Sequence, residues 1–186
     1  MPVYKSPGVY VEEVPGTPPI TPVGTNTAGL IGIVDTTVSS PPNPPDNPSG
    51  AFQMPLKPGS TTDRFVLAPV NEARLVTDFE QFKKQFGDIQ SGNSILAHSV
   101  YGFFNNGGSR CWVVRVADLT DAALVTAALK KLEVIDEIAI VAAPGALSAD
   151  AQLAVIEHCE NMKDRFAVID GQRTTTIDVG SHDIYR

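Results

Sequence analysis

Short apolar runs and longer amphipathic stretches alternate along the last two thirds of the chain. The short runs are almost continuously apolar, whereas in the longer stretches apolar residues recur every three or four positions. The first pattern is typical of strands buried on both faces, and the second is typical of helices with one face against a core. This alternation predicts right-handed strand–helix–strand units, and therefore an α/β fold in which helices cover both faces of a mostly parallel sheet.

The expected strands are short and rich in aliphatic and β-branched residues. The segment 27–34 is interpreted as a buried central strand, with close backbone approach at Gly29 and Gly32. A turn at Asn71 is expected to separate the next two strands. The remaining predicted strands are 65–70, 73–77, 111–116, 138–142 and 166–170.

Four helices are expected between these strands, and three of them have a start signal in the sequence. Thr77 and Glu80 form a capping box ahead of the first helix, and Gly87 is expected to end it as a left-handed cap. Thr120 and Ser148 are expected to cap the third and fourth helices. The predicted core face of the first helix is Phe79, Phe82 and Phe86, and that of the second, over 93–105, is Leu96, Val100, Phe103 and Phe104. In the third helix the predicted core face is Leu124, Ala127, Ala128 and Leu132, and in the fourth it is Leu153, Ile156, Cys159 and Met162.

Proline divides the chain into two regions, because 14 of the 15 prolines lie in residues 1–69. Residues 1–23 are expected to form an extended N-terminal arm, in which only 8–14 is free of proline and able to join the edge of a sheet. The alternative is a chain end without fixed structure. Residues 24–186 are expected to form the α/β body, with a proline-rich surface loop at 39–60. A ligand for a proline-reading domain is the other interpretation of that loop.

Charge and cysteine content exclude several classes of function. The 14 basic residues against 21 acidic residues give a net charge of −7, and no basic stripe is present, so we expect no binding to nucleic acid. No run approaches the roughly 18 to 20 apolar residues of a membrane span, so no membrane insertion is expected. Cys111 and Cys159 lack CxxC spacing, which favours two buried reduced thiols over a disulfide scaffold or a zinc site.

Acidic residues follow several of the predicted strands, at the edge where open α/β sheets bind ligands. Asp35, Asp118 and Asp170 each lie at or just after the end of a strand. Together they could bind Mg²⁺ or activate a nucleophile. Alternatively, each aspartate accepts hydrogen bonds in its own turn. An α/β hydrolase or a nucleotide-binding enzyme that uses these carboxylates is therefore the enzymatic hypothesis.

The sequence contains no motif that would support that hypothesis. The patterns GxGxxG, GxxxxGK[ST] and GxSxG are all missing. His98 and His158 fall in predicted helices and His182 lies near the end, without a nucleophile at a matching position. We therefore predict no catalytic site, no bound cofactor and no metal.

The chain opens with the segment YKSPGVYVEE at 4–13, and further characteristic segments follow it in order. These later segments are 20–23, 27–32, 75–82, 86–87, 97–108 and 111–116. In this order they resemble the contractile tail sheath proteins of phages and related extracellular injection systems, and the opening segment resembles the N-terminal signature of that family.

The resemblance implies a structural protein rather than an enzyme. It implies a body of subtilisin-like topology without a working protease site. It also implies a subunit that polymerises with its own copies around an inner tube, meets baseplate and terminator proteins, and contracts without nucleotide to drive the tube through a target envelope. The particle would be a phage tail or an injection system, assembled in the bacterial cytoplasm. The arm residues that would add a strand to a neighbouring copy are Gly8, Val9, Tyr10, Val11 and Glu12.

The chain departs from the family in one respect. Sheath proteins normally continue with a C-terminal domain that carries a second arm and most of the surface facing the tube. The expectation is therefore that this chain is the N-terminal part of a longer subunit, and that its body is incomplete at the C-terminus. A monomeric interaction module that uses the loop at 39–60 is a third hypothesis.

Overall fold

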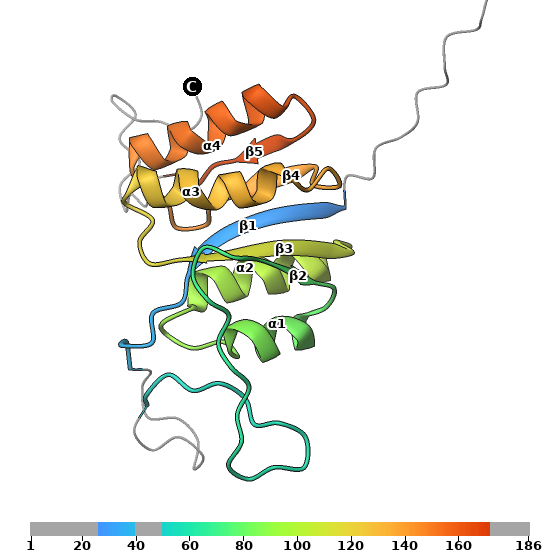
Figure 1. Cartoon of the computed structure of the whole chain (residues 1–186), viewed down its shortest axis with the longest axis vertical. Helices are drawn as coiled ribbons and strands as arrows, with labels where there is room; N and C mark the ends of the chain where they lie inside the picture. Colours follow the sequence, from blue (N-terminus) through green and yellow to red (C-terminus); the bar gives the residue numbers. More distant parts are fainter. Residues whose placement is uncertain (1–25, 40–49, 172–186) are drawn as a thin grey trace, which may run out of the picture.

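A computed structural model describes residues 26–39 and 50–171. The predicted arm, residues 40–49 of the proline-rich loop and residues 172–186 lie outside these ranges. The described part contains one sheet with the strand order β2-β3-β1-β4-β5 (Figure 1). The strands are β1 (Thr27–Ile33), β2 (Ala73–Val76), β3 (Arg110–Val116), β4 (Ile140–Ala142) and β5 (Phe166–Val168).

The sheet is mostly parallel, as the sequence predicted. All seven residues of β1 pair in parallel with β3, from Thr27 with Arg110 to Ile33 with Val116. On its other side β1 pairs in parallel with β4, which in turn pairs in parallel with β5. β2 is the exception, because it runs antiparallel to β3 at one edge. The strand 27–34 was correctly predicted to be central.

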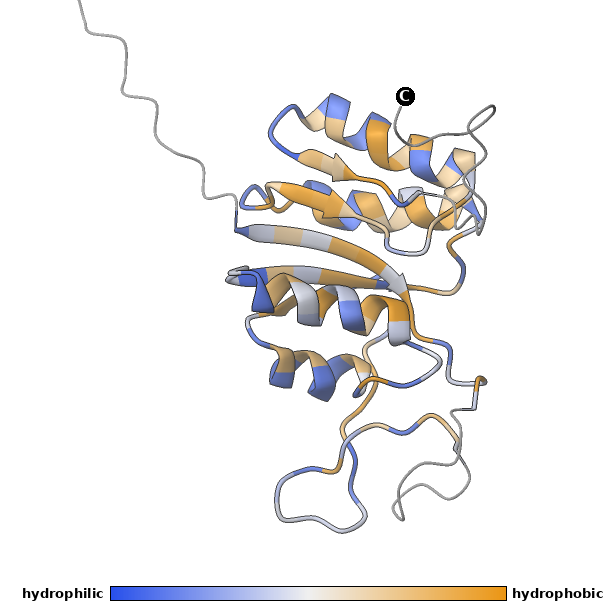
Figure 2. Ribbon diagram, turned by 180° about the vertical axis from the view of Figure 1, so that it is seen from behind, coloured by the Kyte–Doolittle hydropathy of each residue, from blue (hydrophilic) through white to orange (hydrophobic). Residues whose placement is uncertain are grey.

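Helices cover both faces of the sheet, which confirms the predicted layers (Figure 1). Side chains of β1 point alternately to the two faces, so Ile31 joins the core under one pair of helices and Leu30 joins the core under the other. The helices alternate hydrophilic and hydrophobic residues (Figure 2). On the face of Leu30 lie α1 (Phe79–Phe86) and α2 (Ser94–Asn105), and on the face of Ile31 lie α3 (Ala122–Glu133) and α4 (Ala149–Met162). The subtilisin-like topology stays a prediction.

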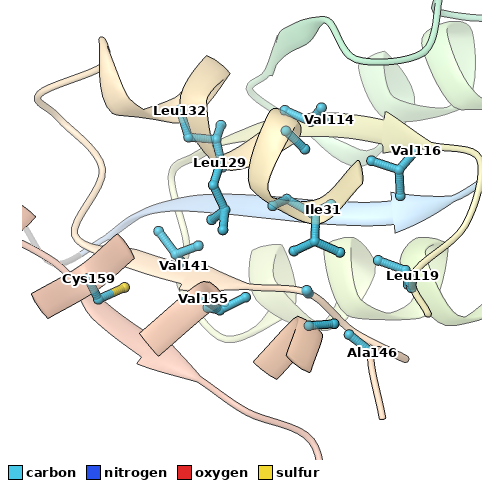
Figure 3. Close-up of a cluster of buried hydrophobic side chains, with 14 of the residues drawn as sticks. Ile31, Val114, Val116, Leu119, Leu129, Leu132, Val141, Ala146, Val155 and Cys159 are labelled. Carbon is cyan, nitrogen blue, oxygen red and sulfur yellow. The ribbon is translucent and has the colours of Figure 1, made fainter. Parts of the chain in front are cut away.

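The core between the sheet and α3 and α4 is aliphatic. In Figure 3 the side chains of β1, β3 and β4 meet those of the two helices in one continuous cluster. Ile31, Val114, Val141 and Leu132 are completely inaccessible to solvent at 0% exposure, which marks the centre of the cluster. Burying each such side chain contributes about 1.5–3 kcal/mol.

The core under α1 and α2 combines aliphatic side chains with a row of aromatic rings. Phe82 and Phe86 are fully buried, and their ring centroids lie 5.2 Å apart in a stacked arrangement. Phe79 stacks on Phe82 at 5.6 Å and meets Tyr101 of α2 edge-on at 5.2 Å. The predicted core face of α1 is therefore confirmed, and core packing accounts for this row of rings.

The two glycines of β1 lie where neighbouring side chains approach the strand closely. A Cβ atom on Gly29 would be 2.9 Å from Leu132 Cδ1, and one on Gly32 would be 2.7 Å from Leu96 Cδ1. The close approach was predicted, but the approaching groups are helix side chains rather than backbone. Each glycine lets one helix lie near the sheet.

The predicted strand at 65–70 is wrong. These residues do not pair with the sheet, and the Val66 side chain is 84% exposed. Their backbone groups bond elsewhere, since Phe65 N donates to Pro55 O and Ala68 N donates to Gln85 O. The apolar run was mistaken for a buried strand. The predicted turn at Asn71 is confirmed by its positive φ of 58°.

Two predicted helix caps are shifted by one residue. The N-cap of α1 is Asp78, whose Oδ1 accepts from Gln81 N at 2.7 Å, whereas Thr77 donates from its backbone N to Gln81 Oε1. The N-cap of α3 is Asp121 rather than Thr120. Aspartate and threonine can both act as the N-cap, and in both helices the aspartate, which lies one residue closer to the first turn, accepts the hydrogen bond from a first-turn N–H group.

The other helix ends agree more closely with the sequence. Ser148 caps α4 as predicted, because its Oγ accepts from Ala151 N at 3.3 Å. The helix predicted over 93–105 is α2, which starts one residue later. Gly87 ends α1 with a φ of 86° and a ψ of 161°, so its φ is positive but its conformation is not the left-handed helical one.

The predicted faces of α3 and α4 are partly wrong. Leu124 is 37% exposed, and Leu153 is 52% exposed. Several apolar residues on each helix allow more than one inward face, and packing against the sheet selects the face with smaller residues on α4. The buried residues are Val125, Ala128, Leu129 and Leu132 on α3, and Ala151, Val155 and Cys159 on α4.

In residues 50–60 of the proline-rich loop, five residues are exposed, four are half-buried, and Gly50 and Met54 are buried. Arg64 Nη1 donates to Met54 O at 2.6 Å, and Leu56 and Arg64 form an isolated antiparallel bridge. This part of the loop therefore has an ordered backbone that is tied to the body.

Candidate functional site

An open hollow lies at the carboxyl ends of β1 and β4, beside the start of α2. Its volume is about 210 Å³, and its lining includes Asp35, Ile95, Leu119 and Gly145. The position is the one at which open α/β sheets bind ligands. However, the volume is below the roughly 300–1,000 Å³ of small-molecule sites. Asp35 supplies the only charge among its lining residues.

Asp35 uses its carboxylate in the turn after β1. Its Oδ1 accepts a hydrogen bond from Thr37 Oγ1 at 2.6 Å and another from Thr37 N at 2.8 Å. These two bonds, with the hydroxyl contributing most, lower the pKa of Asp35 below its ordinary value. The carboxylate therefore serves its own turn, as the structural alternative predicted.

Asp118 repeats this arrangement after β3. Its Oδ1 accepts from Thr120 N at 2.8 Å and from Thr120 Oγ1 at 2.9 Å. The backbone hydrogen bond from Thr120 is the main cause that lowers the pKa of Asp118. Two of the three candidate carboxylates thus belong to Asp-x-Thr turns.

Asp170 differs because it joins two segments that are far apart in the sequence. Its Oδ2 accepts from Gly145 N at 2.7 Å, which ties the end of β5 to the loop after β4. Its backbone oxygen accepts from Gln152 Nε2 of α4 at 2.8 Å. These contacts fix the point at which the chain leaves β5.

The three aspartates therefore have separate structural partners and do not share one site. Asp35 lines the hollow, whereas Asp118 and Asp170 do not. Within 26–39 and 50–171, no three His, Cys, Asp or Glu side chains gather in a way that could hold a metal ion. The structure gives no support to a carboxylate-based reaction at this edge.

The candidate histidines and thiols have structural surroundings. His98 is exposed on α2, and its Nδ1 lies 2.7 Å from Ser94 O. His158 is half-buried, and burial is the main cause that lowers its pKa. His182 lies outside the described residues. Cys111 and Cys159 are both buried, as predicted, and burial raises the pKa of the Cys111 thiol to about 12, so it is not a thiolate at neutral pH.

The β5 end of the sheet carries an uncovered apolar area that was not predicted from the sequence. Phe166 is 77% exposed and Val168 is 52% exposed. The register pairs Phe166 with Ile140 and Val168 with Ala142, so these four side chains share the face of the sheet that carries α1 and α2. Those helices lie over the other strands (Figure 1), which leaves this end of the face open to solvent.

The outer surface of α4 is a second apolar region. Leu153 and Ile156 were predicted to be core residues, but they are 52% and 37% exposed. Large apolar side chains on exposed surfaces are a mark of interaction sites when they occur together. The sequence signal for this region is that α4 has more apolar residues than one inward face can bury.

The predicted arm residues Gly8, Val9, Tyr10, Val11 and Glu12 lie outside the described residues, so their role stays a prediction.

Among the described helices, none has the length and apolar character needed to cross a membrane.

Comparison with known proteins gave one structural relative. No protein-family model matches the chain, and no curated protein matches it. Among solved structures, the chain matches the cryo-EM structure of the helical sheath of the anti-feeding prophage (AFP) in its contracted state. The two chains share 20% sequence identity, and their superposition has a TM-score of 0.48. The match covers 96% of this chain and 43% of the sheath chain, so this chain spans less than half of that protein's length. The chain is thus similar, over nearly its whole length, to a contractile sheath protein.

Proposed function

We propose that this chain is a structural subunit of a contractile sheath, which polymerises around an inner tube. The observation that carries the proposal is the ordered set of sequence segments that resembles the sheath family. Most of these segments belong to one packed part of the body. The segment 27–32 lies in β1, 75–82 joins β2 to α1, 97–108 covers most of α2, and 111–116 lies in β3.

The geometry favours a scaffold over the enzymatic hypothesis. Each strand-end aspartate is engaged in a structural hydrogen bond, and the hollow nearby is small. In contrast, Leu153 and Ile156 expose apolar area on α4 that contacts with other subunits would bury. A protein whose function is assembly needs such surfaces and does not need converging catalytic groups.

In this proposal, the arm joins one copy to the next. Residues 8–12 would add a strand to a sheet of a neighbouring copy through main-chain hydrogen bonds. Val9 and Val11 would share one face of that strand, and Tyr10 would point to the other. The flanking prolines stiffen the arm, and Gly16 and Gly24 provide pivots.

Contraction would then be a rigid-body rearrangement of subunits from a metastable extended lattice to one of lower free energy. A body with a packed core on each face of its sheet is suited to move as a unit. The proposed partners are further copies of the chain, an inner tube protein, and baseplate and terminator proteins. The proposed location is a phage tail or an injection particle, assembled in the bacterial cytoplasm.

Electron microscopy of the complete gene product tests this function. We expect hollow striated cylinders from the native sequence. Val11→Pro removes a main-chain donor from the arm strand, so this variant should remain folded but form no ordered tubes. Thr17→Pro is the matched control, because it adds a proline outside 8–14 and should still assemble.

Ordered tubes from the Val11→Pro variant would rule out the strand-adding role of the arm. The enzymatic hypothesis predicts a different result, namely a Mg²⁺-dependent rise in melting temperature that Asp170→Ala abolishes. We expect no Mg²⁺ effect in either protein, because Asp170 already accepts its hydrogen bond from Gly145.

A further inference from the structure

The loop over 56–64, called the projecting loop here, has an ordered backbone but leaves the body. An isolated antiparallel bridge joins its two ends, and within it Lys57 N donates to Asp63 O at 2.8 Å. Gly59 turns the loop with a φ of 77°, and a Cβ atom added there would have no other atom within 4 Å. Figure 1 shows this segment extending away from the sheet. The projecting loop therefore keeps its shape without packing its tip against the body.

The tip of the projecting loop presents an apolar and a basic side chain side by side in the sequence. Leu56 is 41% exposed, and Lys57 next to it is also exposed. The ion pairs within 26–39 and 50–171 do not include Lys57. A lysine binds best where its aliphatic stem meets apolar groups and its ammonium group meets a carboxylate.

The hollow beside the start of α2 offers that combination. Its lining includes two apolar side chains that are largely open to solvent, Ile95 at 54% and Val38 at 41% exposure. Asp35 is the charged residue of the lining, and its lowered pKa keeps the carboxylate ionised at neutral pH. The hollow is too small for most metabolites, but a single side chain can enter it.

Two further carboxylates make this edge of the sheet negative. Asp170 Oδ2 accepts from the backbone N of Gly145, which lines the hollow, and Asp118 directly precedes Leu119, which also lines it. None of the lining residues is basic. The potential at the hollow therefore favours a cationic side chain over an anionic or neutral one.

We propose that the projecting loop of one copy inserts Lys57 into the hollow of a second copy, where the ammonium group pairs with Asp35. This inference rests on the proposed sheath function and names a contact between its subunits. The projecting loop and the hollow are different surfaces of the chain. Copies would therefore join head to tail, which is the type of contact that builds open helical assemblies.

The occupant comes from a second copy because the two groups are not paired within one chain. The pKa of Asp35 is shifted by hydrogen bonds from Thr37, by burial and by the backbone of Val38, with no contribution from Lys57. A lysine that lay against this carboxylate would lower its pKa further.

A zero-length crosslinker tests the contact in the full chain. A water-soluble carbodiimide couples an amine to a carboxylate when the two groups are in contact, so it should join Lys57 Nζ to the Asp35 carboxylate. An equal mixture of isotope-labelled and unlabelled chains shows whether the link lies between molecules. We expect digested peptides that contain residues 57 and 35 and carry one labelled and one unlabelled half.

Three variants separate charge from chemistry. Lys57→Arg keeps the positive charge without a reactive amine, so copies should still associate while the crosslink disappears. Asp35→Asn keeps an oxygen for Thr37 and should also abolish the crosslink. Lys84→Arg, at an exposed position of α1, is the matched control and should leave the link between Lys57 and Asp35 unchanged.

Sedimentation of the full chain measures the strength of the contact. Lys57→Gln should lower the self-association constant by about two- to five-fold at low salt, which is the range for an exposed ion pair. Added salt should reduce the difference between the two proteins.

The results distinguish this inference from the proposed function. A link confined to single molecules, or no link between Lys57 and Asp35, would overturn the contact, and cylinders that form without the link would leave the sheath function standing. A link between copies with no cylinders in the microscope would support the contact and contradict the sheath function.

Discussion

The two glycines of β1 show how single residues set the distance between layers. Gly32 faces Leu96 of α2, and a Cβ atom there would meet three atoms of that side chain at 2.7–2.9 Å. One of these atoms is Leu96 Cβ itself, which cannot rotate away. Leu96 is 1% exposed, so the space around it is filled.

Gly32→Ala should therefore destabilise the body by about 1–3 kcal/mol through overpacking. Gly102→Ala in α2 is the control, because no atom lies within 4 Å of a Cβ added there. Alanine has the higher helix propensity, so this control should stabilise the body by roughly 0.5–1 kcal/mol. Urea denaturation measures both changes, and equal effects of the two substitutions would contradict the packing argument.

Glu137 links the start of β3 to the loop before β4. Its Oε1 accepts from Trp112 Nε1 at 2.7 Å, and its Oε2 accepts from Arg110 Nη1 at 2.6 Å. The hydrogen bond from Trp112 is the main cause that lowers the pKa of Glu137, followed by that from Arg110. Since the folded-state pKa is below the ordinary 4.5, the carboxylate stabilises the fold above that pH.

This stabilisation should be lost as the pH falls through the folded-state pKa. Glu137→Gln removes the charge but keeps an oxygen for Trp112, so it should be less stable than the native chain near neutral pH. The difference should shrink at pH values well below 4.5, because the native carboxylate is then protonated. Glu160→Gln, on the exposed surface of α4, is the charge-matched control. A pH-independent difference would contradict the linkage.

Residue-level predictions failed where neighbouring residues compete for one role. Asp78 and Asp121 displaced the adjacent threonines as caps, because all of these side chains can accept from a first-turn N–H group. The sequence located the three strand-end aspartates and offered a hydrogen-bonding role in the turn as the alternative to a shared site, but it could not show that Asp170 bonds to the distant Gly145. Such hydrogen bonds depend on backbone paths that local patterns do not define.

At the scale of elements, the end of α4 carries conformational strain. Lys163 is the C-cap, with a φ of 62° and a ψ of 6°, which is the left-handed region that glycine adopts without strain. Its backbone N donates to Cys159 O at 2.9 Å, so the conformation is needed to close the helix.

Lys163→Gly should therefore stabilise the protein by roughly 0.5–1 kcal/mol. Lys163→Ala is the matched control, because it removes the same side chain but keeps the Cβ atom that causes the strain. The alanine variant should show no such gain. Thermal unfolding of the two variants checks the prediction, and a gain in both would point to loss of the lysine side chain as the cause.

Element positions were more predictable than element faces. The central strand, both apolar helix pairs and the N-cap of α4 follow from patterns a few residues long. The inward face of α4 did not, because Ala151 and Val155 form the contact while larger residues remain outside.

The buried position of Arg165 was also not predicted. It is 4% exposed, and its Nη1 donates to Leu132 O at the end of α3, where a positive charge is favourable.

At the scale of the whole molecule, crossover geometry made the layers predictable. Parallel strands joined by helices must place those helices on the faces of the sheet, and the described residues follow this rule. The region 50–70 was not predictable in the same way. Its contacts are to distant groups, such as the mutual hydrogen bonds between Gln53 and Gln90 at 2.8 Å. Only the folded chain brings those groups together.

The packed cores of the described body lie entirely between residues 28 and 167. A chain that lacks residues 1–25 keeps all of these core residues, and we expect it to fold. Its melting temperature should change by less than about 2–4 °C, which corresponds to about 1 kcal/mol in a protein of this size. Trp112, the single tryptophan, reports the transition through its fluorescence.

A core substitution shows how large a real loss would be in that assay. Leu129→Ala empties part of the cluster under α3 and should cost about 2–5 kcal/mol, because Leu129 is 2% exposed. If deletion of 1–25 caused a comparable loss, the arm would be part of the body's own fold. If the deletion instead leaves unfolding cooperative and the melting temperature nearly unchanged, the arm residues 9–11 do not contribute to the stability of their own body. Its residues are then free to bond with another molecule, which is the condition that strand exchange between subunits requires.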